Sequence, residues 1–323
     1  MHNTMDWDIR FNNDGRRYRL GVLAECEITA SVDNLTDTAV IVLPEAKMNN
    51  VFDIQKSIKR GTEVIIKLGY NEVLKTEFVG YIKEITTNDS TLKIHCEDAL
   101  FLFRKSVQDK ELKLTNVKEI AELLVSQIDT SFKVICDYNI AYEKFVFHEA
   151  TAYDVLNKLQ QETKANIYFN TEKKELHIHP PYVEKGGTVG YSLQQNIEQS
   201  SLEYKRAIDK IVEITIESID SKGKVKKITE GTTGGDKISL KVGAMSEADM
   251  RKIANAELVK RNSDGYDGSF DAWLEPFVQP TYTAIVQDSD YPYKDGRYYV
   301  ISVTTNFSES GAKRGVQLGV KLS

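Results

Sequence analysis

The sequence is poor in the residues that mark several specialised protein classes. Its three cysteines, Cys26, Cys96 and Cys136, are odd in number and far apart. This spacing argues against a disulfide framework or a zinc knuckle and favours buried thiols in a protein made in a reducing compartment. No run of about 18 apolar residues is present, so no transmembrane helix is expected. The first residues lack the basic start and apolar core of a secretory signal.

Neither sign of charge is in large excess. The formal net charge is −6 over 323 residues, so the chain has no overall attraction for nucleic acid or anionic lipid. With 28% charged and 41% hydrophobic residues, the composition is that of a globular protein that buries a sizeable core. Disordered, collagen-like and coiled-coil chains are excluded. The length suggests two or three domains.

Short β-branched runs separated by turn-forming residues dominate residues 1–106. They predict five or six strands in a small antiparallel barrel or sandwich. The segment 44–61 interrupts this pattern with apolar residues beside positive charge, and we interpret it as an inserted loop or short helix. Its apolar residues either contact a partner or cover the open end of the barrel. These candidate contact residues are Val51, Phe52, Ile54 and Ile58.

Residues 107–181 change to a helical period. Asn116 can cap a helix with apolar residues every three or four positions, and Thr151 begins a second helix, with Asp154 completing a capping box. Strands are expected beside both helices. The segment therefore reads as a small α/β module of about 70 residues, closed by the consecutive prolines at 180–181.

Strands return in residues 182–323. Apolar and polar residues alternate along 211–219, which predicts a strand with one buried and one wet face. One inserted helix is expected at about 246–262, capped by Ser246. We therefore predict a mainly β fold with an α+β insertion, in which two antiparallel β-barrels are separated by the small α/β module.

The two β regions share a repeat. Residues 81–88, YIKEITTN, correspond to residues 299–306, YVISVTTN, with four identical positions and two exchanges of Ile for Val. Each copy follows a glycine and leads through a polar turn to another strand. Two similar hairpins can arise by chance, because β-branched residues are common in strands. The alternative is a duplicated barrel with the α/β module inserted between the copies.

Two side-chain pairs have the spacing of chemical sites. His177 and His179 share one face of a strand and could bind a metal, but the sequence places no third ligand, so a polar edge-strand pair is the stronger interpretation. Glu25 and Glu27 share a face in the same way. They read as a solvated face rather than as paired acid and base carboxylates.

Two loops resemble binding motifs without matching them. Residues 231–238 are glycine-rich but lack the order of a phosphate-binding loop. Residues 288–296 are rich in aspartate, but Pro292 breaks the periodicity of a calcium loop, so a hairpin tip is expected. No activated nucleophile can be named. We predict no enzyme activity, no catalytic residue, no cofactor and no metal.

Six segments follow one another in a characteristic order. They are FVGYI (78–82), HCEDAL (95–100), ATAYDVLNKL (150–159), ANIYF (165–169), MSEADMRKIA (245–254) and DGRYYVISV (295–303). In this order the chain resembles the central baseplate hub proteins of contractile phage tails and related injection systems, the late control protein D family. One departure is PTY at 280–282, where a Pro-Gly turn is expected.

The resemblance implies a structural function. Such hubs are similar to a tail-tube protein duplicated within one chain, so three subunits present six barrels and join a six-fold tail tube to a three-fold spike. The implied partners are a homotrimer, the tail tube protein, the central spike protein and other baseplate proteins. The implied location is the tail baseplate of a phage-like particle assembled in the bacterial cytoplasm.

The implied hub surrounds a channel. DNA would pass through its lumen without specific binding, and the chain would not insert into a membrane. The alternating strands would build the inner wall, where polar faces such as Glu213, Thr215 and Glu217 line the lumen or face solvent.

Two other functions stay open. A cell-wall-degrading tail hydrolase would need a cleft with a carboxylate of raised pKa, which no residue marks. A non-enzymatic adaptor or binding module is the other alternative, and the missing secretory signal argues against a periplasmic one.

Overall fold

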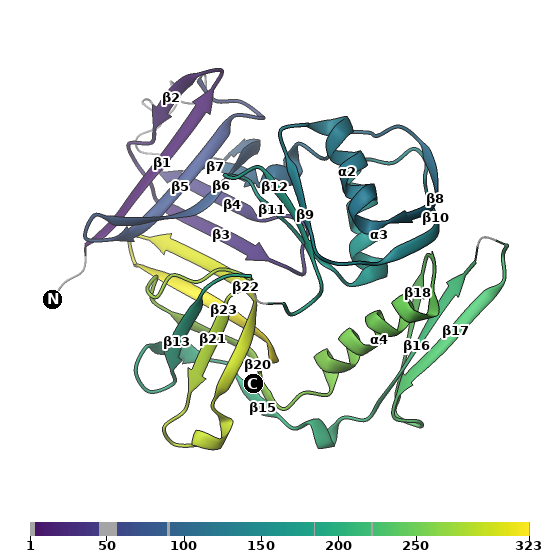
Figure 1. The fold of residues 1–323 in the computed structure, drawn as a ribbon. Helices are drawn as coiled ribbons and strands as arrows, with labels where there is room; N and C mark the ends of the chain where they lie inside the picture. Colours follow the sequence, from purple (N-terminus) through teal and green to yellow (C-terminus); the bar gives the residue numbers. More distant parts are fainter. Residues whose placement is uncertain (1–3, 45–56, 89–90, 184, 221, 323) are drawn as a thin grey trace.

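The computed structural model describes residues 4–44, 57–88, 91–183, 185–220 and 222–322. Most of the strands belong to one sheet of 14 strands that combines both ends of the sequence (Figure 1). Among the described residues, three sheets of three strands each and the helices α2 (Val117–Ile128), α3 (Ala152–Thr163) and α4 (Glu247–Arg261) lie to one side of it. The protein is therefore mainly β, as its sequence predicts.

The N-terminal part of the large sheet pairs in the order β3-β4-β7-β6-β5-β1-β2, and every pair is antiparallel. Alternate residues along these strands are buried and form one hydrophobic core. The strands are β1 (Met5–Asn13), β2 (Arg16–Arg19), β3 (Glu25–Ser31), β4 (Thr38–Pro44), β5 (Glu63–Tyr70), β6 (Val73–Thr87) and β7 (Thr91–Glu97).

The C-terminal part of the large sheet has its own core, rich in aromatic side chains such as Tyr191, Phe270 and Tyr298. Tyr191 packs edge to face against Phe270, with ring centroids 4.6 Å apart. Its strands are β13 (Thr188–Ser192), β14 (Ile197–Ser200), β15 (Glu203–Lys205), β20 (Gly265–Ala272), β21 (Thr283–Gln287), β22 (Gly296–Ser308) and β23 (Gly311–Lys321).

The two parts of the large sheet are joined by direct pairing of β3 with β22. The register runs from Ser31 opposite Ser302 to Glu25 opposite Ser308. The expectation of two separate barrels is therefore corrected. Within the described residues the strands follow an open path from β14 to β2, and backbone hydrogen bonding continues across the boundary between the two regions.

The middle segment contributes two helices and all but one strand of two short sheets. One sheet has the order β19-β10-β8, in which β19 (Ala244–Met245) comes from the C-terminal region, and the other has the order β11-β12-β9. The predicted caps are confirmed, because Asn116 accepts the Glu119 N–H and Thr151 with Asp154 forms a full capping box. The elements are β8 (Lys110–Asn116), α2 (Val117–Ile128), β9 (Lys133–Cys136), β10 (Ala141–Phe147), α3 (Ala152–Thr163), β11 (Asn166–Asn170) and β12 (Glu175–His179).

A third small sheet, β17-β16-β18, is inserted between β15 and β20 and packs against α4 (Figure 1). Residues 212, 214, 216 and 218 of β16 are buried, which confirms the alternation predicted there. Within the described residues β16 pairs with β17 and β18 and does not join the large sheet, and a channel wall formed by its polar face stays a prediction. The elements are β16 (Val212–Ile219), β17 (Val225–Gly231), β18 (Asp236–Val242), β19 (Ala244–Met245) and α4 (Glu247–Arg261).

Two short helical turns, η2 (Ala99–Phe101) and η3 (Ala207–Asp209), lie where one unit follows another, and η4 (Pro292–Lys294) lies between β21 and β22. The helix predicted at about 246–262 is α4, and Ser246 caps it by accepting the Asp249 N–H, as expected.

Candidate functional site

Both parts of the large sheet have the same strand order. Following the chain, β1, β3, β4, β5, β6 and β7 correspond to β13, β14, β20, β21, β22 and β23. The first set pairs as β3-β4-β7-β6-β5-β1 and the second as β14-β20-β23-β22-β21-β13. One pair differs in direction, since β1 is antiparallel to β5 whereas β13 is parallel to β21. The sequence repeat at 81–88 and 299–306 is therefore part of a longer structural correspondence.

A β-bulge occurs at the same place in both copies. The register between β6 and β7 shifts between Ile82 and Glu84, and the register between β22 and β23 shifts between Val300 and Ser302. The extra residue is Lys83 in the first copy and the aligned Ile301 in the second. Chance similarity of two strands does not account for a shared bulge, because a bulge depends on the local backbone and not on β propensity.

The two copies differ at one edge. In the second copy, residues 302–308 of β22 pair with β23 on one side and with β3 on the other. In the first copy, residues 84–87 of β6 pair with β7. No strand of the described chain pairs with the opposite side of these four residues, and the side chains of Glu84 and Thr86 are exposed. We call residues 84–87 of β6 the open edge.

A second unpaired strand edge lies at the far end of the sheet. Strands β14 and β15 together take the place of β3, and in the described part of the chain both pair only with β20. Strand β15 continues the register in which Thr29 of β3 pairs with Thr38 in the first copy. In that register Lys205, which lies opposite Gly265, corresponds to Ser31. We call residues 200–205 the β14–β15 edge.

The bulge carbonyls show how each copy completes its backbone hydrogen bonding. The Ile301 carbonyl accepts the backbone N–H of Val32 at 3.0 Å, where β3 runs alongside β22. The equivalent Lys83 carbonyl accepts the Arg60 guanidinium at 2.7 Å. A side chain therefore occupies the position at the open edge that a neighbouring backbone occupies in the other copy.

A buried ion pair links the two parts of the sheet. Arg314 of β23 forms two hydrogen bonds with Glu77 of β6, at 2.7 and 2.9 Å, and the two side chains are 1% and 4% exposed. The guanidinium also donates to the Leu274 carbonyl and to the Thr305 hydroxyl. This bidentate geometry fixes the two halves in one relative orientation.

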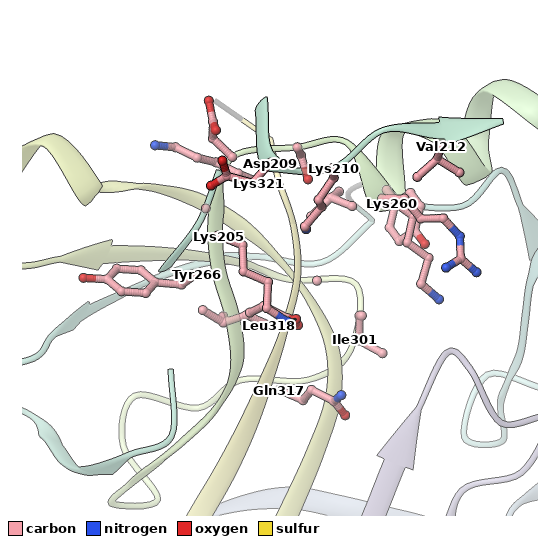
Figure 2. A pocket seen from close by; sticks show the side chains of 18 of the residues that line it. Lys205, Asp209, Lys210, Val212, Lys260, Tyr266, Ile301, Gln317, Leu318 and Lys321 are labelled. Carbon is pink, nitrogen blue, oxygen red and sulfur yellow. Dashed lines mark hydrogen bonds and ion pairs between the residues drawn. The ribbon is translucent and has the colours of Figure 1, made fainter. Parts of the chain in front are cut away.

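A polar cavity of about 450 Å³ lies between the C-terminal strands and α4 (Figure 2). Lys205 from the β14–β15 edge points into it beside Lys210 and Lys260. Five basic and five acidic side chains line the cavity, so it selects neither anions nor cations by charge.

Of the four residues predicted as contact sites, the structure describes only Ile58. Val51, Phe52 and Ile54 lie outside the described residues. Ile58 is 3% exposed and packs in the N-terminal core. That position fits the interpretation in which this segment covers the end of the strands.

The two side-chain pairs identified in the sequence have different surroundings in the structure. Glu25 and Glu27 are both exposed on β3, as expected for a solvated face. His177 and His179 lie side by side on β12, with ring nitrogens 3.1 Å apart. The aspartate-rich segment 288–296 connects the antiparallel strands β21 and β22, as predicted for a hairpin tip.

One pair of carboxyls has raised pKa values. Burial raises the pKa of Asp37 to about 7, and burial together with the charge of Asp37 raises that of Asp98. Asp98 accepts the backbone N–H groups of Asp37 and Leu100, and Asp37 accepts that of Ser31. Three of the four carboxyl oxygens thus accept backbone N–H groups, so the pair caps a turn and η2.

Two further kinds of feature are not found in the described chain. No three histidine, cysteine, aspartate or glutamate side chains converge there on a metal position. Among the same residues, no helix is long and apolar enough to cross a membrane. The described chain does present the repeated strands, the open edge and the β14–β15 edge.

Comparisons with known proteins find similarity in solved structures. No family model and no curated protein matches the chain. The tail protein from Neisseria meningitidis MC58 aligns with a TM-score of 0.68 and 14% identity, over 98% of this chain and 96% of that one. The 43 kDa tail protein of prophage MuSo2 from Shewanella oneidensis aligns with a TM-score of 0.64 and 14% identity, over 96% and 98% of the two chains.

A secretion-system protein shares the same architecture. The E. coli c3393 protein is a component of the type VI secretion system with structural similarity to the T4 bacteriophage tail proteins gp27 and gp5. It aligns with a TM-score of 0.62 and 11% identity, over 98% of this chain and 77% of its own. The chain therefore has the fold of phage tail proteins and of their type VI secretion counterpart, as the order of its sequence segments led us to expect.

Proposed function

We propose that this chain is a structural component of the tail baseplate of a phage or phage-like particle. Three copies form a central hub that joins a six-fold tail tube to a three-fold spike. The observation that carries the proposal is the pairing of β3 with β22 inside one chain, together with unpaired equivalents of both strands. The proposed role is to match symmetries, and it uses no catalytic residue.

The geometry of the intrachain junction can be repeated between chains. Within one chain, the β3 edge of the first copy pairs with β22 of the second. If the β14–β15 edge pairs in the same way with the open edge of a neighbouring chain, every copy has the same contacts. Three chains then close a ring of six similar β units, because each chain contributes two.

The proposed junction has a defined register. Ser31 lies opposite Ser302 and Thr29 lies opposite Thr304 within the chain. Transferring this register places Lys205 of one subunit opposite Glu84 of the next. No described residue forms an ion pair with Glu84 in the single chain. Opposite charges on directly facing residues of paired strands contribute about 0.2–1 kcal/mol per pair.

The remaining partners follow from the ends of such a ring. One rim would contact the tail tube protein and the opposite rim the central spike and other baseplate proteins. Val51, Phe52 and Ile54 remain candidates for a tube or subunit contact. The chain has no excess of positive charge, and this supports a lumen that lets DNA pass without specific binding.

The test is a charge exchange across the proposed junction. Wild-type chain at high concentration should sediment at about three times its 36.6 kDa mass in analytical ultracentrifugation. Glu84→Lys should weaken the trimer, since it places two lysines opposite each other at three junctions. Adding Lys205→Glu should restore part of the lost affinity, although this variant also loses the ion pair of Lys205 with Asp267.

A matched control uses an ion pair far from either edge. Lys118 and Glu122 lie on α2 with half-exposed side chains 3.7 Å apart. Exchanging their charges alters the chain by the same amounts and should leave trimer formation unchanged. A wild-type chain that stays monomeric at its highest soluble concentration, alone and with its spike, would refute the hub.

A further inference from the structure

A row of four polar side chains runs along β12 in the β11-β12-β9 sheet. Glu175, His177 and His179 project from the same face of β12, and Asp137 follows β9. Glu175 lies 2.9 Å from Nε2 of His177, and Asp137 lies 2.5 Å from Nδ1 of His179. Between the two rings, Nδ1 of His177 lies 3.1 Å from Nε2 of His179.

The two carboxylates determine which ring nitrogens carry hydrogen. An ionised carboxylate only accepts hydrogen bonds, so Nε2 of His177 and Nδ1 of His179 must both donate. A neutral imidazole carries a single N–H. When both rings are neutral, the two inner nitrogens therefore face each other with lone pairs and no hydrogen between them. A cation between the rings removes this conflict.

The surroundings hold both rings in place. The His179 side chain is 4% exposed. Lys185 adds a positive charge by pairing with the same aspartate. His177 is held in place by Tyr168, whose ring stacks on it at 4.9 Å, with planes 5° apart.

We propose that Nδ1 of His177 and Nε2 of His179 together bind a divalent transition-metal cation of the zinc class. Their 3.1 Å separation is close to the roughly 3.3 Å between two nitrogens that each lie about 2.05 Å from a tetrahedral zinc. Metal-binding histidines almost always donate their other N–H to a carboxylate or carbonyl, and here both do. Imidazole nitrogens favour zinc, copper and nickel over magnesium and calcium.

The other coordination positions would be filled by water. The described chain places no third histidine, cysteine, aspartate or glutamate at this point. A cavity of about 610 Å³ opens beside the pair and is lined by Tyr168, His177 and His179. A site with two protein ligands and open positions binds metal reversibly and can accept a further donor from a partner. This inference is independent of the proposed baseplate role.

The test is zinc binding by the full-length chain at pH 7.5, followed by competition with a chromophoric zinc indicator. We expect one zinc ion per chain, no competition by excess magnesium, and an affinity about ten-fold or more weaker in His177→Gln and His179→Gln. Asp137→Asn, which changes a positioning residue, should weaken binding by about ten-fold. The control is His148→Gln, because His148 also pairs with an aspartate but has no second imidazole beside it.

A second measurement does not depend on variants. Nitrogen-15 NMR of the wild-type histidines at pH 8 should show unprotonated Nδ1 in His177 and unprotonated Nε2 in His179, and both signals should shift when zinc is added. Absence of zinc binding, equal binding by His177→Gln, or a proton shared by the inner nitrogens at pH 8 would each overturn the proposal.

Discussion

Removing the charge of Arg314 should destabilise the protein more than any surface substitution. The guanidinium is 1% exposed and bridges β23 to Glu77 of β6, 237 positions away in the chain. In Arg314→Met, the Glu77 carboxyl stays buried at 4% exposure but loses both hydrogen bonds from the guanidinium. Breaking a buried pair by removing one partner costs about 3–5 kcal/mol.

The double variant separates this cost from the value of the pair itself. Glu77→Met combined with Arg314→Met removes both charges and leaves apolar side chains of similar volume. Such replacements are often neutral or stabilising, so the double variant should recover most of the loss. The recovery should be incomplete, because Arg314 also satisfies the Leu274 carbonyl, which would then be buried without a donor.

The assay is urea unfolding followed by circular dichroism, with free energies obtained by linear extrapolation. We expect Arg314→Met to lower the free energy of unfolding by about 3–5 kcal/mol. A loss below about 1 kcal/mol, or a double variant as unstable as the single one, would refute the reasoning that an uncompensated buried carboxylate sets the cost.

Two further predictions concern the ends of local elements. Burial raises the pKa of Glu97, but hydrogen bonds and charges from Arg104 and Lys83 outweigh it and hold the pKa below the ordinary 4.5. The ionised group therefore stabilises the fold above that value, and the deficit of Glu97→Gln in thermal unfolding should shrink as pH falls from about 5 to about 3. A deficit independent of pH would contradict this. Thr151→Ala should lower the free energy of unfolding by about 0.5–2 kcal/mol, because the α3 capping box is lost. Thr151→Ser keeps the capping hydroxyl and should not lower it. If urea unfolding gave the two variants equal stability, the cap would not be the cause.

Local features were predictable from the sequence. Asn116, Thr151 and Ser246 signal their helices through short-range hydrogen bonds, and each caps the predicted one. The alternation in residues 211–219 correctly identified a buried face. It did not identify the sheet that β16 joins, because any apolar cover, here α4, produces the same pattern.

Long-range features were not predictable. The pairing of β3 with β22 joins segments that have no sequence signal for each other, so two barrels were expected where one continuous sheet is formed. In the same way, His177 and His179 were placed on one face from their spacing alone. Asp137, which orients His179, follows a separate strand, β9, and could be found only in three dimensions.

The junction between β3 and β22 also affects biosynthesis. Ser31 leaves the ribosome about 270 residues before its partner Ser302, so at 5–20 residues per second the nascent chain waits roughly 15–50 s for this pairing. During that interval the β3 backbone is a template for other extended segments, including those of neighbouring nascent chains. The exposed glutamates Glu25 and Glu27 lie on this strand and oppose such association. The charge of these two glutamates therefore disfavours aggregation of the nascent chain during translation.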